Sequence, residues 1–217
     1  VDFTGSQEAF KSLEDPIADL NEALYTCEVE KAAFAPALIK KNEGFMNAGQ
    51  VQYVCRAGNF LRKGLPYTGV LNVLKVMMGY EYLWTNIRVK GDAYGCMGGF
   101  ARNGASYFVS YRDPNLGQTV DVYEKAAEFI ANYEADERTM TQYIIGTFSN
   151  IDMPLTASAK GRRSKVAYMT GVTIEMSQKD RDEVLQVTPE HIRELSKYIE
   201  AFMEDDCFCV VGNEQKI

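Results

Sequence analysis

Histidine is nearly absent from this sequence of 217 residues, in which only His191 occurs. A histidine-based zinc site would therefore need remote cysteines or acids, and none of these has helical ligand spacing. No G-x-S-x-G turn is present to activate a serine, and no G-x-x-x-x-G-K-[ST] loop is present to hold phosphates. The sequence alone does not exclude a Ser-His-Asp arrangement. His191 lies in the first turn of an expected helix, and we interpret it as a capping or solvent-facing residue.

Long hydrophobic runs and a positive charge balance are also missing. Lys75, Glu81 and Arg88 interrupt the longest apolar stretch before it reaches the roughly 20 residues of a membrane-spanning helix. The first residues are polar and acidic, unlike a signal peptide, and the start at Val1 suggests a cut or processed product. The net charge of −7 argues against a nucleic-acid surface. We therefore expect no membrane partner and no nucleic-acid partner.

Cysteine is present in an odd number and at irregular spacing, at positions 27, 55, 96, 207 and 209. Because no C-x-x-C pair occurs, the pattern favours neither a disulfide framework nor a zinc ribbon. A reducing, cytoplasm-like compartment follows. The basic cluster from Lys160 to Lys165 contains no aromatic residues for base stacking, so we interpret it as a solvated loop.

Ordinary globular proportions, 46% hydrophobic and 24% charged residues, predict one domain over residues 1–217. Apolar patterns predict strands at 1–3, 51–58, 94–102, 105–112 and 207–213. Apolar residues at helical spacing predict helices from Thr4 or Ser6 to about Tyr25, at 67–87, 117–133 and 136–149, and from Ser177 and Thr188 onward. Residues 40–50 form the expected connector. Pro16 is expected to kink the first helix.

The helix at 67–87 is apolar on nearly every side, which predicts a position between a sheet and other helices. Asn103-Gly104 separates two strand-like runs and predicts a hairpin in which both residues take positive φ. A hairpin combined with segregated helices indicates an α+β fold: one mostly antiparallel sheet with helices packed on one face.

Between the buried helix and the hairpin lies NIRVKGDAYG, which contains Arg88 and Tyr94 on either side of a glycine turn. A structural interpretation is available for both residues. An arginine at a helix end stabilises the helix dipole, and the tyrosine can pack on a strand. The composition of the segment alone favours this structural interpretation.

The segment YEYLWTNIRVKGDAYG, together with SYFVSYRDPNL, QYIIGTFSNIDMP, GVTIEMSQKDRDEVLQVT and CFCVVGNEQKI, resembles the C-terminal half of the pitrilysin/insulinase superfamily of zinc metallopeptidases. The resemblance is closest to the presequence protease and falcilysin branch and covers the chain from about Gly49 onward. The zinc motif H-x-x-E-H is absent, so the chain resembles the non-catalytic fourth domain alone. The resemblance implies a metallopeptidase-like domain that holds no zinc or other cofactor, with zinc bound in the N-terminal half of the intact enzyme.

The family motif R-x-K-G-G-A-Y-G implies that Arg88 and Tyr94 reach a peptide chamber, where a guanidinium binds substrate carbonyls and a phenol stabilises an oxyanion. Asp92 departs from the motif, which has glycine there. The resemblance implies that the chain itself is inactive and that its partners are the catalytic half of the same polypeptide and peptide substrates, in the cytoplasm or an organellar matrix. Self-association of the isolated domain is also expected. The alternative is an inactive structural or peptide-binding subunit that pairs with a separate catalytic chain.

Overall fold

The protein is described by a computed structural model that covers residues 1–24, 26–27 and 40–216. The chain divides into two compact units. The smaller unit comprises residues 1–39 and 153–177, and the larger one comprises residues 40–152 and 178–217. The larger unit contains the sheet and the candidate site.

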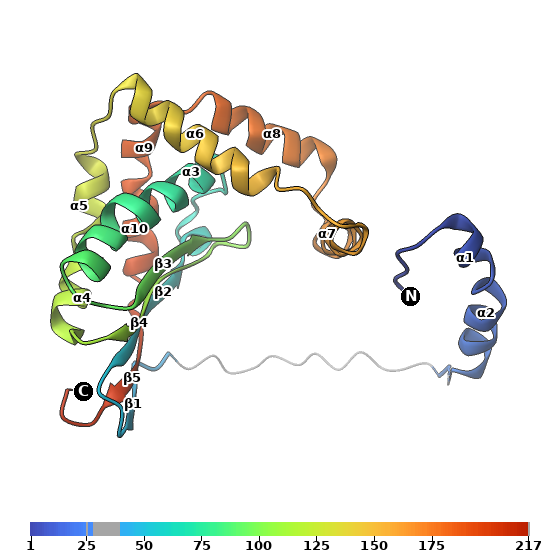
Figure 1. Ribbon diagram of the computed structural model, residues 1–217, viewed down its shortest axis with the longest axis horizontal. Helices are drawn as coiled ribbons and strands as arrows, with labels where there is room; N and C mark the ends of the chain where they lie inside the picture. Colours follow the sequence, from blue (N-terminus) through green and yellow to red (C-terminus); the bar gives the residue numbers. More distant parts are fainter. Residues whose placement is uncertain (25, 28–39, 217) are drawn as a thin grey trace. The chain divides into compact units, whose positions relative to one another are not determined.

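Five strands make the sheet of the larger unit, in the order β1-β5-β2-β4-β3 (Figure 1). Their bounds are β1 Glu43–Asn47, β2 Gln52–Asn59, β3 Gly95–Phe100, β4 Ala105–Asp113 and β5 Cys207–Asn213. β1 runs parallel to β5, and the remaining pairs, β5 with β2, β2 with β4 and β4 with β3, are antiparallel. The predicted α+β fold with a mostly antiparallel sheet is therefore confirmed, and four of the five predicted strands are present.

The helices of the larger unit lie on one face of this sheet (Figure 1). In chain order they are η1 Phe60–Lys63, α3 Val70–Met77, η2 Met78–Tyr82, η3 Trp84–Val89, α4 Leu116–Glu124, α5 Ala126–Ala131, α6 Glu137–Ile151, α8 Ile174–Leu185, α9 Pro189–Glu194 and α10 Ser196–Met203, with the start of α8 belonging to the smaller unit. η1 is a 3₁₀ turn, whereas η2 and η3 continue α3 as wider π-helical turns. Asp136 caps α6, and Thr188 caps α9 with Pro189 in its first turn, as predicted.

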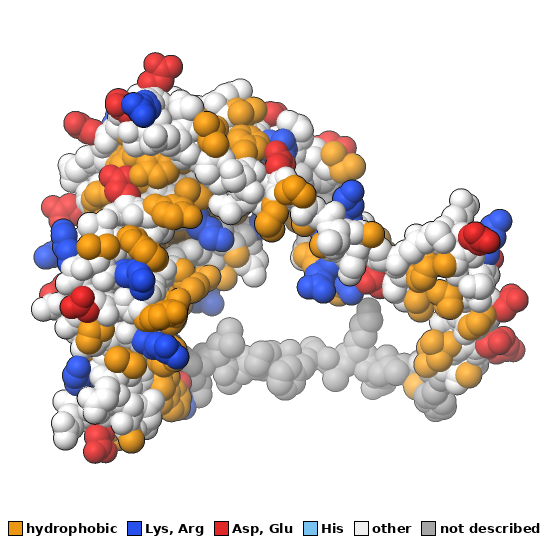
Figure 2. Space-filling view, in the orientation of Figure 1, with side chains coloured by type: hydrophobic (Ala, Val, Ile, Leu, Met, Phe, Trp, Pro, Cys, Tyr) orange, Lys and Arg blue, Asp and Glu red, His pale blue; other side chains and the backbone are white. Residues whose placement is uncertain are grey.

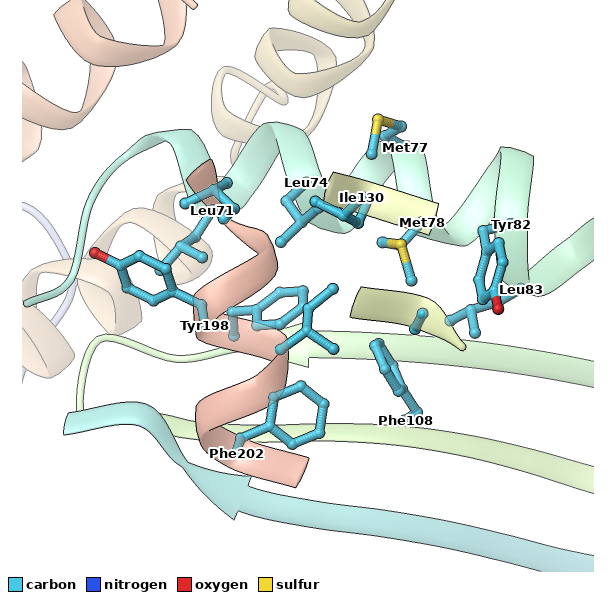
Figure 3. Packing of buried hydrophobic residues seen from close by; sticks show 14 of the residues in the cluster. Leu71, Leu74, Met77, Met78, Tyr82, Leu83, Phe108, Ile130, Tyr198 and Phe202 are labelled. Carbon is cyan, nitrogen blue, oxygen red and sulfur yellow. The ribbon is translucent and has the colours of Figure 1, made fainter. Parts of the chain in front are cut away.

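The side chains of α3 and α10 meet the sheet in one hydrophobic core (Figure 3). Phe108 of β4 is fully buried, and its ring centroid lies 5.1 Å from that of Phe202 and 5.6 Å from that of Tyr123. α3 buries residues all round, including Leu71, Leu74 and Met77, as expected for a helix between a sheet and other helices.

The opposite face of the sheet bears exposed apolar side chains, because successive strand residues point to alternate faces. Tyr53 of β2 is 47% exposed, whereas Val54 beside it is fully buried. Phe45, Met97 and Tyr107 lie on the same open face and are also exposed. An apolar face of this kind marks a surface that another protein can cover.

The hairpin between β3 and β4 forms at the predicted place but with a different turn. Gly104 has φ of 84°, while Asn103 is not among the described residues with positive φ. The amide of Gly104 donates to Ala101 at 2.8 Å, and Ala101 pairs with Ala105, which is the three-residue loop closed by a left-handed glycine. The expectation of positive φ at both residues was therefore wrong.

The smaller unit contains α1 Gln7–Lys11, α2 Glu14–Ala23 and α7 Ala157–Thr170 besides the start of α8. None of these three helices contains a buried residue. Hydrophobic side chains lie at the surface of the segment that carries α1 and α2 (Figure 2). Phe10, Leu20 and Leu24 are 40%, 53% and 55% exposed. Because short helices gain most of their stability from packing an apolar face, this face is suited to contact with further protein.

Several predicted elements differ from the structure. Residues 1–3 form no strand, and the expected connector contains β1, which the local sequence hides because pairing with distant β5 creates it. The basic cluster lies on α7, whose Thr156 cap and left-handed Gly171 delimit a helix with a solvated face. α8 begins three residues before Ser177.

The first predicted helix is split in two. Ser6 caps α1 as predicted, but the break lies at Ser12 and Leu13, ahead of Pro16. Proline clashes with the carbonyl four residues before it, so the chain starts a new helix that places Pro16 in its first turn. The predicted end near Tyr25 lies outside the described residues.

Candidate functional site

Arg88 and Tyr94 lie on either side of the turn that connects η3 to β3. Both line an open depression of about 520 Å³, together with Val89, Asp92, Ala93 and Arg112. Tyr94 is 58% exposed, and Arg88 is half-buried. The structure thus brings the two sequence-predicted residues to one concave surface.

The Arg88 guanidinium is oriented by aromatic rings and by the backbone. Its Cζ lies 4.6 Å from the ring centroid of Trp84 and 5.7 Å from that of Tyr94. Its Nη1 donates a hydrogen bond to the backbone carbonyl of Tyr94. No other acceptor among the described residues is hydrogen-bonded to Arg88, so most of its five guanidinium donors are available to a ligand.

The wider turns of η3 set the direction in which Arg88 leaves the helix. The amide of Lys90 donates to the carbonyl of Thr85 at 3.1 Å, five residues back along the chain. Such π-helical turns add a residue to the helix and shift the side chains that follow. Ala93 then donates to Ile87 at 3.1 Å, which closes the turn back onto the helix end.

Gly91 and Asp92 give the turn its shape. A Cβ at Gly91 would lie 2.6 Å from the carbonyl oxygen of Ile87, so only glycine fits without a backbone shift. Asp92 adopts φ of 57°, the left-handed conformation that glycine occupies most easily. Aspartate tolerates this conformation better than most residues do, so the turn exists although the motif glycine is replaced.

The segment after β4 anchors the turn. The Nδ2 of Asn115 donates to the carbonyl of Gly91 at 2.6 Å, and the amide of Asn115 donates to Asp113 Oδ1 at 2.8 Å. Asp113 is fully buried, and its Oδ2 accepts hydrogen bonds of 2.6 Å from both Ser110 and Thr119. A buried carboxylate with several donors holds this corner rigidly, and with it the depression.

Arg112 is a third residue of the depression, which the sequence reasoning missed. It is exposed, adopts φ of 49°, and its Cζ lies 5.2 Å from the Tyr94 ring centroid. Its carbonyl accepts a hydrogen bond of 3.2 Å from the amide of Tyr94. The signal available in the sequence was an arginine at a strand end immediately before Asp113-Pro114.

Neither Arg88 nor Arg112 forms an ion pair with the described acids. Asp92 lines the same depression and is exposed. The Tyr94 ring thus has two guanidiniums close to it, that of Arg88 at 5.7 Å and that of Arg112 at 5.2 Å from its centroid. No hydrogen bond of the phenol oxygen occurs in the described part of the chain. This arrangement can bind peptide carbonyls or a carboxylate and can donate from the phenol.

The other chemical candidates have structural roles. His191 Nδ1 accepts a hydrogen bond from the Thr188 amide while the Thr188 hydroxyl accepts one from the amide of His191, so the predicted capping role is confirmed. Within residues 1–24, 26–27 and 40–216, no group of three or more His, Cys, Asp or Glu could hold a metal ion. The residues described do not fit a zinc site. No described helix meets the length and apolarity needed to cross a membrane.

A comparison with known protein families identifies the family of this chain. The model of the PreP C-terminal domain family matches residues 42–212. The chain belongs to this family. The resemblance to the presequence-protease branch of the pitrilysin/insulinase superfamily is thereby confirmed.

Relatives agree with this assignment. The chain is 38% identical over 217 residues to Protein HypA of Clostridium perfringens, and it covers 22% of that protein. It is 32% identical over 178 residues to presequence protease 1, chloroplastic/mitochondrial, of Arabidopsis thaliana, with 82% of this chain and 16% of that protein covered. This member of the PreP C-terminal domain family therefore spans about a fifth of these relatives' length.

Among solved structures, the peptidase M16 inactive domain from Pseudomonas fluorescens is similar in fold. Its TM-score is 0.63 at 13% identity, with 94% of this chain and 51% of that one covered. The likeness confirms the M16 peptidase-like domain fold.

Proposed function

We propose that this PreP C-terminal domain serves a zinc-dependent metalloendopeptidase that degrades oligopeptides. In this proposal the domain completes the substrate chamber without cutting peptides itself, and the zinc belongs to the N-terminal half of the same polypeptide. The observation that carries the proposal is the exposed Tyr94 side chain, whose ring lies 5.7 Å from the Arg88 guanidinium and 5.2 Å from that of Arg112, while neither arginine forms an ion pair with an acid of the described residues. The active enzyme is proposed to work in the cytoplasm or an organellar matrix.

Arg88 and Tyr94 have distinct parts in this proposal. Arg88 binds a carbonyl of the peptide with donors that the Tyr94 backbone leaves free. Tyr94 donates its phenol proton in a hydrogen bond to the oxygen on which negative charge develops during attack. Such a donor is worth more in the transition state than in the ground state, so its loss lowers kcat.

The apolar surfaces support the proposed partner. The open sheet face around Tyr53 and the exposed faces of α1 and α2 are suited to contact with the rest of a longer polypeptide. The chain covers 22% and 16% of two relatives' length, and these longer proteins are consistent with such a partner. The isolated domain is expected to self-associate through these surfaces, which sedimentation at increasing concentration would measure.

The test uses the full-length enzyme with Arg88→Ala and Tyr94→Phe. Tyr94→Phe should lower peptide turnover by about 10²-fold, the loss typical of an oxyanion donor. Arg88→Ala should also lower peptide turnover, and the zinc content should be unchanged in both variants. Lys90→Ala and Tyr80→Phe are matched controls, because both residues are exposed and neither lines the depression. Turnover equal to wild type for both site variants would remove the assignment.

An inactive structural or peptide-binding subunit is the second candidate. The observation that favours it is the engagement of Arg88 with the Tyr94 carbonyl and the Trp84 ring, which a purely structural arginine would also show. The coding sequence upstream of Val1 separates the two: an in-frame H-x-x-E-H motif supports the enzyme, and a nearby start codon supports the subunit.

A further inference from the structure

Three of the five cysteines lie on the open face of the sheet. Cys55 of β2 and Cys207 and Cys209 of β5 are half-buried and unpaired by disulfides. The register sets Cys55 directly opposite Cys209, whereas Cys207 lies opposite Ala57. Neighbouring residues Val54 and Val210 point into the core, which places Cys55 and Cys209 on the accessible side.

The geometry of an antiparallel pair selects one combination of these thiols. Directly opposed residues have Cα atoms about 4.5–5.5 Å apart, which lies inside the range of about 4.4–6.8 Å for disulfides. The diagonal pair of Cys55 and Cys207 is separated by about 7–8 Å, beyond that range. In addition, the Cys207 thiol donates to the carbonyl of Asp205 at 3.6 Å.

We propose that Cys55 and Cys209 form an oxidation site, a dithiol that a small-molecule disulfide such as oxidised glutathione converts to a cross-strand disulfide. One cysteine thiolate attacks the oxidant and releases one glutathione thiolate, giving a mixed disulfide. The second cysteine attacks the mixed disulfide and releases the second glutathione. The two cysteines lose two protons and two electrons, and the oxidant takes up both electrons. This dithiol uses neither Arg88 nor Tyr94, but it lies on the open sheet face that the proposed function assigns to contact with the rest of the polypeptide, so its oxidation is tested on this chain alone.

The environment of Cys55 sets the conditions for the reaction. Burial and the neighbouring Cys209 raise the pKa of the Cys55 thiol. Because the thiolate is the nucleophile, the crosslink should form faster as the pH rises above neutrality. In a reducing compartment the pair stays in the dithiol form.

The test is oxidation of the folded chain carrying Cys27→Ser, which removes the exposed Cys27 thiol. After incubation with oxidised glutathione, acid quenching and alkylation, peptide mass spectrometry should find a Cys55–Cys209 link, with Cys96 and Cys207 still alkylated. The oxidised protein should unfold at higher denaturant concentration than the reduced protein, because the link closes a long loop.

The variants keep the inference falsifiable. Cys207→Ser should retain the link, whereas Cys209→Ser should leave Cys55 with at most one glutathione. Separate, stable glutathione adducts on Cys55 and Cys209, a link through Cys207, or no reaction at either residue would each overturn it. If a serine variant fails to fold, peptide mass spectrometry of the oxidised wild-type protein still distinguishes these outcomes.

Discussion

The guanidinium of Arg88 donates to the backbone carbonyl of Tyr94 and lies 5.7 Å from the centre of the same residue's ring. One side chain thus fixes the backbone from which the other projects. The Tyr94 ring also contacts Tyr111, with centroids 5.6 Å apart at 60°. Its neighbours therefore hold the Tyr94 ring in place while the residue stays 58% exposed, which suits a donor to an external ligand.

Arg112 is predicted to share the peptide-binding role. In the full-length enzyme, Arg112→Ala should lower kcat/KM by about tenfold to a hundredfold, since a hydrogen bond to a charged group contributes about 1.5–3 kcal/mol. Steady-state kinetics on a peptide substrate measures this. Arg138→Ala, an exposed arginine at the start of α6, is the control. Equal kinetics for the Arg112 and Arg138 variants would assign Arg112 a structural position only.

Asp92 is predicted to be replaceable by glycine but not by a β-branched residue. At φ of 57°, Asp92→Val should lower the free energy of unfolding by about 1–2 kcal/mol, the cost of a left-handed conformation for such a side chain. Asp92→Gly should not destabilise the protein, because glycine occupies this region freely. Denaturant unfolding of both variants provides the comparison. A valine variant as stable as the glycine variant would contradict the assigned turn geometry.

Phe108 and Tyr107 are adjacent residues on opposite faces of β4. Their alanine variants are predicted to lose very different amounts of unfolding free energy. Phe108→Ala should cost about 3–5 kcal/mol, because it empties a fully buried site packed against Phe202 and Tyr123. Tyr107→Ala removes a side chain that is 38% exposed and should cost much less. Chemical denaturation measures both. Equal losses would mean that the open face is covered in solution.

Asp206 is predicted to contribute to acid stability. Hydrogen bonds from Arg56, Lys40 and Asn42 lower the pKa of its carboxyl group from the ordinary 3.8 to about 2. A lowered pKa means that the unfolded state takes up the proton first, so the stability due to Asp206 is present above about pH 4. It is lost as the pH falls towards 2.

The measurement is the denaturation midpoint as a function of pH. Wild type should lose stability between about pH 4 and pH 2 more steeply than Asp206→Asn, which has no carboxyl group to titrate there. Parallel curves for the two proteins across this interval would show that the interactions of Asp206 contribute nothing.

Local patterns in the sequence determined much of the fold. The alternation in 51–58, the apolar run before Ile87 and the caps at Asp136 and Thr188 each correspond to an observed element. Side-chain periodicity and capping hydrogen bonds involve residues that are close together in the chain, so the sequence alone shows them. The glycine turn between Arg88 and Tyr94 was also located from sequence, although the interpretation of those residues as a site came from family resemblance.

Only the tertiary structure decided the rest. β1 exists because β5, more than 150 residues away in the chain, supplies its hydrogen-bond partners. Arg112 joins Tyr94 because β4 returns beside β3, and Cys55 meets Cys209 because of the strand register. Non-local pairing leaves no periodic trace in a single sequence. The sequence therefore determined the chemical type of each side chain and much of the local secondary structure. The pairing of the strands determined which side chains lie next to one another, and this decides what they can do together.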